Sequence, residues 1–193
     1  MLIIVRHGRT AANAQGRLLG RDDPPLDEEG RAQALRVGAA LQADRVVSSP
    51  LLRARQTAEA FGCPIEVDER WIELDYGDLE GTPTADVPRE TWAEWRADVC
   101  YHPEGGESLV ELQRRVAGAC DELIEEATRR DVVVVTHVSP VKAAVAWALG
   151  VGCEVSWRTF VAPASITRIA GGPWGPSLHT FNETAHLTSD RPR

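Results

Sequence analysis

The stretch LIIVRHG at residues 2–8 is the starting point for predicting the fold. Its first four residues are continuously apolar, which is typical of a strand buried on both faces of a parallel sheet. The run ends on Arg6 and His7, two polar side chains that a buried strand does not need for packing. We therefore expect both to serve a site at the end of the strand, with Gly8 letting the backbone turn tightly beside them.

Two further apolar runs, RVVSS at 45–49 and DVVVVTH at 131–137, are predicted to be strands of the same sheet. Helical patterns separate and follow them, at residues 27–42, 51–61, 108–130 and 141–149. The first of these carries Leu35, Gly38 and Leu41 on one side, and Ser108 with Glu111 forms a capping-box pattern in the third. This alternation predicts an α/β fold, a three-layer sandwich with a mostly parallel central sheet flanked by helices.

The end of the chain is expected to add a hairpin or a pair of edge strands, from SITRIA at 165–170 and SLHTF at 177–181, before the last residues, TSDRPR, fray. With 193 residues, 43% of them hydrophobic, the chain is predicted to form a single domain over 1–193.

The net charge of -8, from 21 Lys+Arg against 29 Asp+Glu, argues against partners such as nucleic acid or an anionic membrane. No apolar run approaches the ~20 residues that span a bilayer, so a cytoplasmic location is expected. The four cysteines form no Cys-x-x-Cys pair, which signals neither a zinc knuckle nor a disulfide framework. Composition leaves a homodimer possible.

Polar side chains stand at the carboxyl ends of all three predicted strands. Arg6 and His7 end the first, Ser48 and Ser49 the second with Arg53 one turn further, and Thr136 and His137 the third. In open α/β sheets ligands bind outside these ends. Ser49-Pro50 and Ser139-Pro140 each predict an N-cap and a first helical residue, and helix N-termini attract anions. Two histidines and two arginines at one sheet edge suit a phosphate group.

Each of these residues, taken alone, is compatible with an ordinary structural role. A single histidine at a strand end is more often structural than catalytic, and a single arginine is usually a surface ion-pairing group. A zinc site is disfavoured because no His-Glu-x-x-His or comparable ligand spacing is present. The coincidence of Arg6, His7, Arg53 and His137 at one edge favours a functional site.

Taken together, these segments resemble the histidine phosphatase superfamily, in its phosphoglycerate-mutase-like branch. Arg6-His7-Gly8 matches the Arg-His-Gly signature and Asn13 the asparagine after it. The segments GRDDPPLDEEGRAQA, SSPLLRARQTA, ELDYGDLEG, PEGGES, VVVVTH and NETAHL follow in the family's order. The likeness covers nearly the whole chain.

The resemblance implies a phosphomonoesterase that acts on a small phosphorylated metabolite. His7 would be the nucleophile, forming a phosphohistidine, and Glu73 the general acid and base. Arg6, Arg53 and His137 would surround the phosphoryl oxygens. Asn13, Gly20 and Val138 are further candidates for phosphate contact. The scheme requires no metal and no cofactor.

Glu73 is preferred over Asp75, Asp78 and Glu80 because it stands four residues before Gly77, as the family's acid stands before its glycine. Two positions depart from the family's pattern. Val138 follows His137 where glycine is usual, and it would be strained if the position needed a positive φ. Arg9 replaces a glutamate or glutamine, and solvated surface is expected for it.

Residues 82–106 are expected to form a helical flap that sets specificity. Trp92, Trp95 and Val99 fall on one helical face, which favours packing against the body of the domain over substrate contact. Tyr101 and His102, in a looser stretch, are the predicted substrate contacts.

Three functions then compete: a phosphatase, a phosphoglycerate mutase, and a noncatalytic relative that binds phosphorylated ligands. The mutase is disfavoured because the Arg-rich insertion is replaced by an acidic, Trp-bearing stretch. Retention of Arg6, His7, Arg53, Glu73 and His137 together speaks against the noncatalytic relative.

Overall fold

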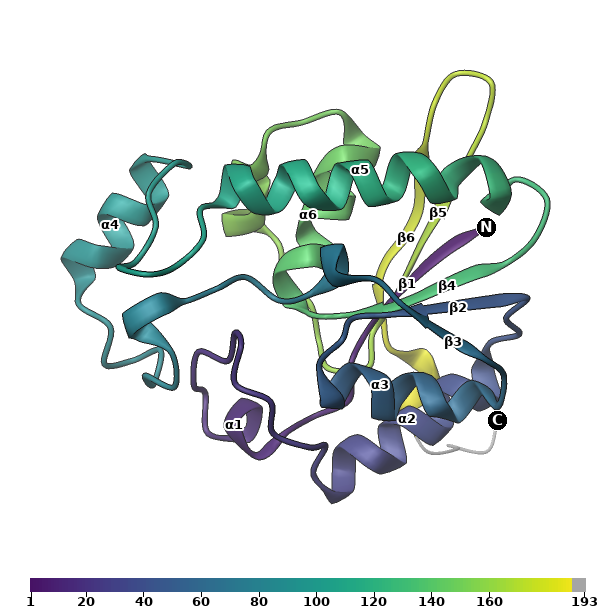
Figure 1. Cartoon of the computed structure of the whole chain (residues 1–193), viewed down its shortest axis with the longest axis horizontal. Coiled ribbons are helices and arrows are strands. Elements are labelled where there is room, and N and C mark those ends of the chain that lie inside the picture. Colours follow the sequence, from purple (N-terminus) through teal and green to yellow (C-terminus); the bar gives the residue numbers. More distant parts are fainter. Residues whose placement is uncertain (189–193) are drawn as a thin grey trace.

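A six-stranded sheet forms the centre of the molecule, in a computed structural model that describes residues 1–188 (Figure 1). The strand order is β3-β2-β4-β1-β5-β6, in which the first four strands are parallel and β5 and β6 are antiparallel additions. The bounds are β1 Leu2–Arg6, β2 Arg45–Ser48, β3 Ile65–Val67, β4 Val132–Thr136, β5 Ile166–Ala170 and β6 Ser177–Glu183. The sheet confirms the predicted α/β fold and its C-terminal hairpin.

Helices cover both faces of this sheet, with α5 and α6 on one side and α2 and α3 on the other (Figure 1). The α-helices are α1 Ala11–Ala14, α2 Glu28–Ala40, α3 Leu52–Ala58, α4 Arg89–Ala97, α5 Leu109–Ala127 and α6 Val138–Leu149. Five 3-10 turns are described, η1 Glu59–Phe61, η2 Glu69–Trp71, η3 Gly77–Leu79, η4 Cys153–Arg158 and η5 Ala185–Leu187. Among residues 1–188, no helix has the length and apolar character needed to cross a bilayer.

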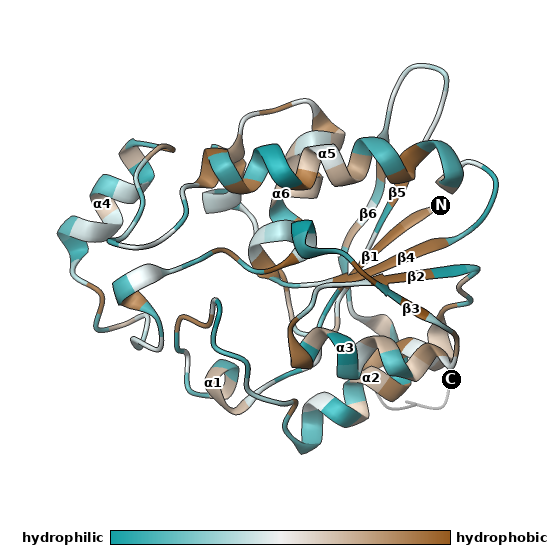
Figure 2. Cartoon of the chain, in the orientation of Figure 1, coloured by the Kyte–Doolittle hydropathy of each residue, from teal (hydrophilic) through white to brown (hydrophobic). Residues whose placement is uncertain are grey.

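The core has two halves because alternate residues of a strand face opposite sides of a sheet. Leu2 and Ile4 pack among the apolar residues of α5 and α6, whereas Ile3 and Val5 pack against α2 and α3. Every residue of β1 and β4 is buried, and Figure 2 shows these central strands as hydrophobic ribbons between more polar helices. Burial on both faces explains the uninterrupted apolar runs of the sequence.

The predicted helix starts are correct for α5 and wrong for α3 and α6. Ser108 forms the predicted capping box with Glu111. However, α6 begins at Val138 with His137 as its N-cap, and α3 begins at Leu52 with Leu51 as its N-cap. The proline of the Ser-Pro pair is tolerated in the first turn of α6, because the first four N–H groups of a helix have no partner inside it.

The predicted apolar side of α2 is only partly right. Ala34 and Val37 face the core, and Leu41 is buried just after the helix, but the side chain of Leu35 is 69% exposed. Gly38 lies against α3 and η1, where a Cβ would come within 2.3 Å of the carbonyl oxygen of Ala60. Residues 189–193, which hold most of the segment predicted to fray, lie outside the described part.

Candidate functional site

The carboxyl ends of β1, β4 and β2 bring the predicted site residues together. Arg6 pairs with Thr136 in the parallel ladder, and the N–H of His7 then donates to the carbonyl of Thr136 at 2.8 Å. The rings of His7 and His137 therefore lie side by side, with centroids 5.0 Å apart. Ser49 reaches the same edge from β2, and its Oγ lies 2.6 Å from Nε2 of His137.

The imidazole of His7 is held in one tautomer. Its Nδ1 lies 2.6 Å from the carbonyl oxygen of Gly8, and because a carbonyl oxygen only accepts hydrogen bonds, Nδ1 must carry the proton. Nε2 then holds the lone pair. Burial lowers the pKa of His7 well below its ordinary value of 6.5, and the charges of Arg53 and Arg6 lower it further. The ring is neutral at neutral pH and has one free nucleophilic nitrogen.

Gly8 is required by a close approach of two backbone segments. A Cβ at this position would lie 2.4 Å from the carbonyl oxygen of Gly30, at the start of α2. Its N–H donates to Oγ1 of Thr57 on α3 at 3.0 Å. The φ of Gly8 is not positive, so the need for glycine lies in this contact rather than in a left-handed turn.

Two buried guanidinium groups lie beside the histidines. Main-chain carbonyl groups hold them, that of Val161 for Arg6 and those of Gly20 and Asp22 for Arg53. Arg53 is fully buried. Burial lowers the pKa of both groups, that of Arg6 to about 10, while the Glu73 carboxylate opposes the shift. Both cations thus lie within electrostatic reach of one acid.

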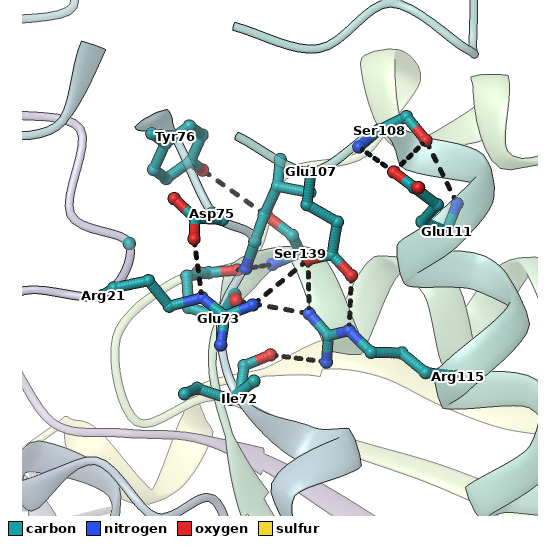
Figure 3. A network of polar contacts seen from close by, with 12 residues as sticks. Arg21, Ile72, Glu73, Asp75, Tyr76, Glu107, Ser108, Glu111, Arg115 and Ser139 are labelled. Atoms are coloured by element: carbon teal, nitrogen blue, oxygen red, sulfur yellow. Dashed lines mark hydrogen bonds and ion pairs between the residues drawn. The ribbon is translucent and has the colours of Figure 1, made fainter. Parts of the chain in front are cut away.

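Glu73 is the only buried acid among the four considered in the loop 73–80, with an exposed fraction of 3%. Its Oε1 accepts hydrogen bonds from the backbone N–H of Leu74 at 2.7 Å and of Ser139 at 3.2 Å (Figure 3). Since Ser139 lies in the first turn of α6, this hydrogen bond holds the carboxylate of Glu73 against the helix that follows His137. By contrast, Glu80 binds the N–H groups of Gly20 and Arg21.

The backbone before Glu73 is fastened by Arg115 of α5 (Figure 3). Its Nη1 donates to the carbonyl oxygens of Arg70 at 2.6 Å and Ile72 at 2.7 Å, and its Nη2 to that of Glu73 at 3.2 Å. Glu107 pairs with the same guanidinium, at 2.7 Å between Oε1 and Nε. This ion pair therefore sets the position of the loop that carries the acid.

His137 and Val138 form the start of α6. Burial first, and then the charge of Arg53, lower the pKa of His137 well below 6.5. Its Nδ1 is buried and has no hydrogen-bond partner in residues 1–188. Within the same range, Ala164 and Asn182 are the non-glycine residues with positive φ. Val138 therefore adopts ordinary helical geometry without the strain considered for it.

The remaining predicted residues occupy different places. Oδ1 of Asn13 accepts from the N–H of Thr10 at 3.1 Å, which leaves its amide NH2 as the available donor. The N–H of Gly20 is bound by Glu80 and its carbonyl by Arg53.

Tyr101 packs on Trp95, with ring centroids 5.9 Å apart, and His102 is exposed. Neither lines the cavities described below, and their role as substrate contacts stays a prediction. Arg9 forms an ion pair with Asp27 at 2.8 Å.

A cavity of about 150 Å³ lies next to Glu73 and the start of α6. Trp92 and Trp95 stack at 5.7 Å, and Trp157 of η4 meets both rings edge-on. The full lining is Leu18, Leu74, Tyr76, Trp92, Trp95, Leu109, Val138, Ser139, Lys142, Ser156 and Trp157. The predicted packing of Trp95 against the domain body is confirmed by its burial.

Sequence reasoning missed Arg115, Trp157 and Lys142 as members of this region, and it assigned Ser49 to a helix cap rather than to His137. Helical spacing could have indicated Lys142, which follows Ser139 by one turn. No group of three or more His, Cys, Asp or Glu in residues 1–188 is placed to hold a metal ion.

The fold and the cluster of two histidines, two arginines and one buried acid are those of a phosphate-handling α/β protein. The family model of the histidine phosphatase superfamily (branch 1) matches residues 2–184, and the chain belongs to this family.

Curated relatives include the bifunctional protein Rv2228c of Mycobacterium tuberculosis, 37% identical over 201 residues. That match covers 96% of this chain and 54% of the relative, so the chain spans about half the length of that protein. Another is the probable phosphoglycerate mutase GpmB of Salmonella paratyphi C, 34% identical, with 95% and 93% of the two chains covered.

Solved structures of similar fold include two phosphatases. A mycobacterial glucosyl-3-phosphoglycerate phosphatase, Rv2419c, in complex with VO3 has a TM-score of 0.86 at 30% identity, covering 95% of this chain and 98% of that one. Phosphoserine phosphatase of Entamoeba histolytica in complex with 3-phosphoglyceric acid has a TM-score of 0.90 at 25% identity, covering 97% and 98%.

Proposed function

We propose that this protein is a phosphomonoesterase that hydrolyses a small phosphorylated metabolite through a phosphohistidine on His7. The observation that supports this most directly is the contact between Nδ1 of His7 and the Gly8 carbonyl. It leaves Nε2 unprotonated beside two guanidinium groups. A neutral histidine among cations suits nucleophilic attack on a phosphate dianion.

In the first step, the lone pair of His7 Nε2 attacks phosphorus and the P–O ester bond breaks. Glu73 gives a proton to the departing oxygen, so the alcohol leaves uncharged. In the second step, water attacks the phosphohistidine, Glu73 takes the proton from that water, and the P–N bond breaks. The electron pair returns to Nε2 and inorganic phosphate is released. The residues alone complete the cycle, without a metal.

The remaining groups act on the charge of the transferring phosphoryl group. Arg6 and Arg53 would neutralise it, and His137 would donate from Nδ1, with its Nε2 accepting from the hydroxyl group of Ser49. The start of α6 adds backbone N–H groups near Val138. The NH2 of Asn13 is a further donor to the phosphoryl oxygens.

Residues 82–106, including α4, would cover the site as a flap within one domain spanning 1–193. A cytoplasmic enzyme fits this role.

The alternative is a phosphoglycerate mutase, and it is favoured by the similarity to GpmB proteins. A mutase would pass the same phosphoryl group from His7 to a second hydroxyl group instead of to water. The solved phosphatases argue for hydrolysis. A noncatalytic phosphate-binding protein is opposed by the presence of both the nucleophile and the acid.

The test is to trap the intermediate and to follow the phosphate. The native chain is incubated with ³²P-labelled phenyl phosphate in the presence of EDTA, quenched in alkali, and analysed for acid-labile label. His7→Ala should abolish both label and release of phosphate, and His179→Ala, an exposed histidine on β6, should retain both. Label without release of phosphate, together with conversion of 3-phosphoglycerate, would favour the mutase. Turnover that survives His7→Ala would disprove the mechanism.

A further inference from the structure

Lys142 is the only lysine of the chain. Its ammonium group makes fewer hydrogen bonds within the protein than it can donate. Its Nζ donates to the carbonyl of Ser156 at 2.8 Å. An ammonium group has three donors, and Lys142 forms no ion pair with an acid in residues 1–188. The side chain of Lys142 is half-buried, so its charge is partly removed from water, and this burial lowers its pKa. A partly desolvated cation with free donors is suited to an anionic ligand.

Lys142 stands where two hollows meet. The first is the Trp-lined cavity beside Glu73, about 150 Å³ in volume, which has room for one aromatic ring. The second, about 370 Å³, we call the basic mouth. Its lining is Arg89, Trp92, Arg96, Lys142, Ser156, Trp157 and Thr159. The two hollows share Trp92, Lys142, Ser156 and Trp157 and are therefore adjacent.

The charges of the basic mouth have one sign. Arg89 and Arg96 extend from α4 and are exposed, and the guanidinium of Arg96 lies 5.5 Å from the ring centre of Trp157. No acid lines either hollow. In a chain of net charge -8, three cations around one opening form a local exception. Such a focus of positive charge attracts and orients an anion.

We infer that the substrate's alcohol portion carries a ring-sized apolar group next to the ester and, beyond it, a second anionic group that Lys142 binds. This rests on the proposed function, because it places the phosphoryl group at His7 and the leaving oxygen at Glu73. The ring occupies the cavity that Trp92 and Trp157 help to line. The second anion, a carboxylate or another phosphate, lies in the basic mouth.

The experiment compares two esters that differ only in this charge. The probes are 3-(carboxymethyl)phenyl phosphate and its neutral amide, 3-(carbamoylmethyl)phenyl phosphate. We expect the native chain to prefer the carboxylate by about tenfold or more in kcat/KM, mainly through KM. In Lys142→Met the preference should fall to within about twofold of unity, because kcat/KM for the carboxylate should fall far more than kcat/KM for the amide. Arg129→Met, which removes an exposed charge in the loop before β4, should keep the preference.

Two results would overturn the inference: equal kcat/KM for both esters in the native chain, or equal losses on both in Lys142→Met. The second would mean that Lys142 acts on Glu73, whose charge reaches it.

A binding measurement keeps this inference separate from the proposed function. The corresponding benzylphosphonates, which cannot be hydrolysed, are titrated by tryptophan fluorescence. Tighter binding of the carboxylate that depends on Lys142, without hydrolysis of either ester, would reject the phosphatase and retain the subsite. Hydrolysis of the esters without charge-dependent binding of the phosphonates would retain the phosphatase and reject the subsite.

Discussion

The groups around His7 are placed by strand ends, whereas the groups around Lys142 are placed by helices and loops far apart in sequence. At the proposed phosphoryl end, His7 and His137 follow paired residues of β1 and β4, so the hydrogen bonds of the sheet fix their spacing. At the proposed leaving-group end, Trp92 and Trp157 belong to α4 and η4, and they meet only through side-chain packing.

This difference suggests that the two ends have different functions. In the proposed mechanism, the end built on the strands would bind the phosphoryl group, which is common to every phosphomonoester, while the end built by packing could vary with the leaving group. Mutations at the first should affect all substrates, and mutations at the second should change their ranking.

The largest effect is expected from removal of the proposed nucleophile, His7. His7→Ala should lower kcat by about 10⁴-fold or more on every phosphomonoester, since a pathway through the phosphohistidine cannot proceed without it. Steady-state kinetics on phenyl phosphate and on the carboxylate ester would measure this. A loss confined to one of the two esters would contradict the division between the two ends.

The proposed phosphoryl end was largely predictable from sequence because its residues directly follow the apolar runs that form the strands. The apolar run that ends on Arg6-His7 indicates where the strand ends. The parallel arrangement of the sheet then brings His137 to the same edge. The burial of Arg53 was not predictable, because it depends on carbonyl groups of Gly20 and Asp22 in a distant loop.

The leaving-group end depends on how distant segments pack, and sequence reasoning named only part of it. Trp92 and Lys142 are 50 residues apart, and no periodicity links them to Trp157. The misplaced helix starts have a similar origin. The ladder of β4 ends at Thr136, so α6 starts directly after His137 and Ser139 is left to bind Glu73 instead of capping the helix.

The paired histidines should make stability depend on pH. The pKa values of His7 and His137 are both held well below 6.5 by burial and neighbouring cations. As pH falls below 6.5, the unfolded chain takes up protons that the native state does not, so stability is full above 6.5 and declines below it. The decline should reach about 1.4 kcal/mol per pH unit for each histidine.

Urea unfolding between pH 7 and pH 5 measures this slope. His137→Gln should remove about half of the dependence contributed by the pair, and His179→Ala should leave their contribution unchanged. A native slope indifferent to His137→Gln would show that this ring is protonated in the folded state.

A more moderate effect is expected where the two ends join, at the ion pair that holds the Glu73 loop. Arg115→Met removes the donors to the carbonyl groups of Ile72 and Glu73 and should lower kcat by about 10- to 100-fold, with little change in KM. Because the loss acts through proton delivery, it should be larger for an alkyl phosphate than for 4-nitrophenyl phosphate, whose leaving group needs no proton. Arg129→Met is the control. Equal losses on both esters would show that Arg115 supports the fold generally rather than the acid.

The smallest effect is expected at Val138, which belongs to both ends. It directly follows His137 and lines the Trp-bordered cavity, yet its backbone is already helical. Val138→Gly therefore relieves no strain and should cost at most about 1 kcal/mol of stability.

On phenyl phosphate, kcat for Val138→Gly should stay within about threefold of the native value, because the N–H at the start of α6 is present in either residue. Removing the side chain widens the cavity, so any change should appear as a shift in KM between the small ester and the larger carboxylate ester. Steady-state kinetics on both esters measures it. A tenfold gain in kcat on phenyl phosphate would mean that valine displaces the amide from the phosphoryl group. In that case the phosphoryl end would be tuned by the same residue that shapes the leaving-group end.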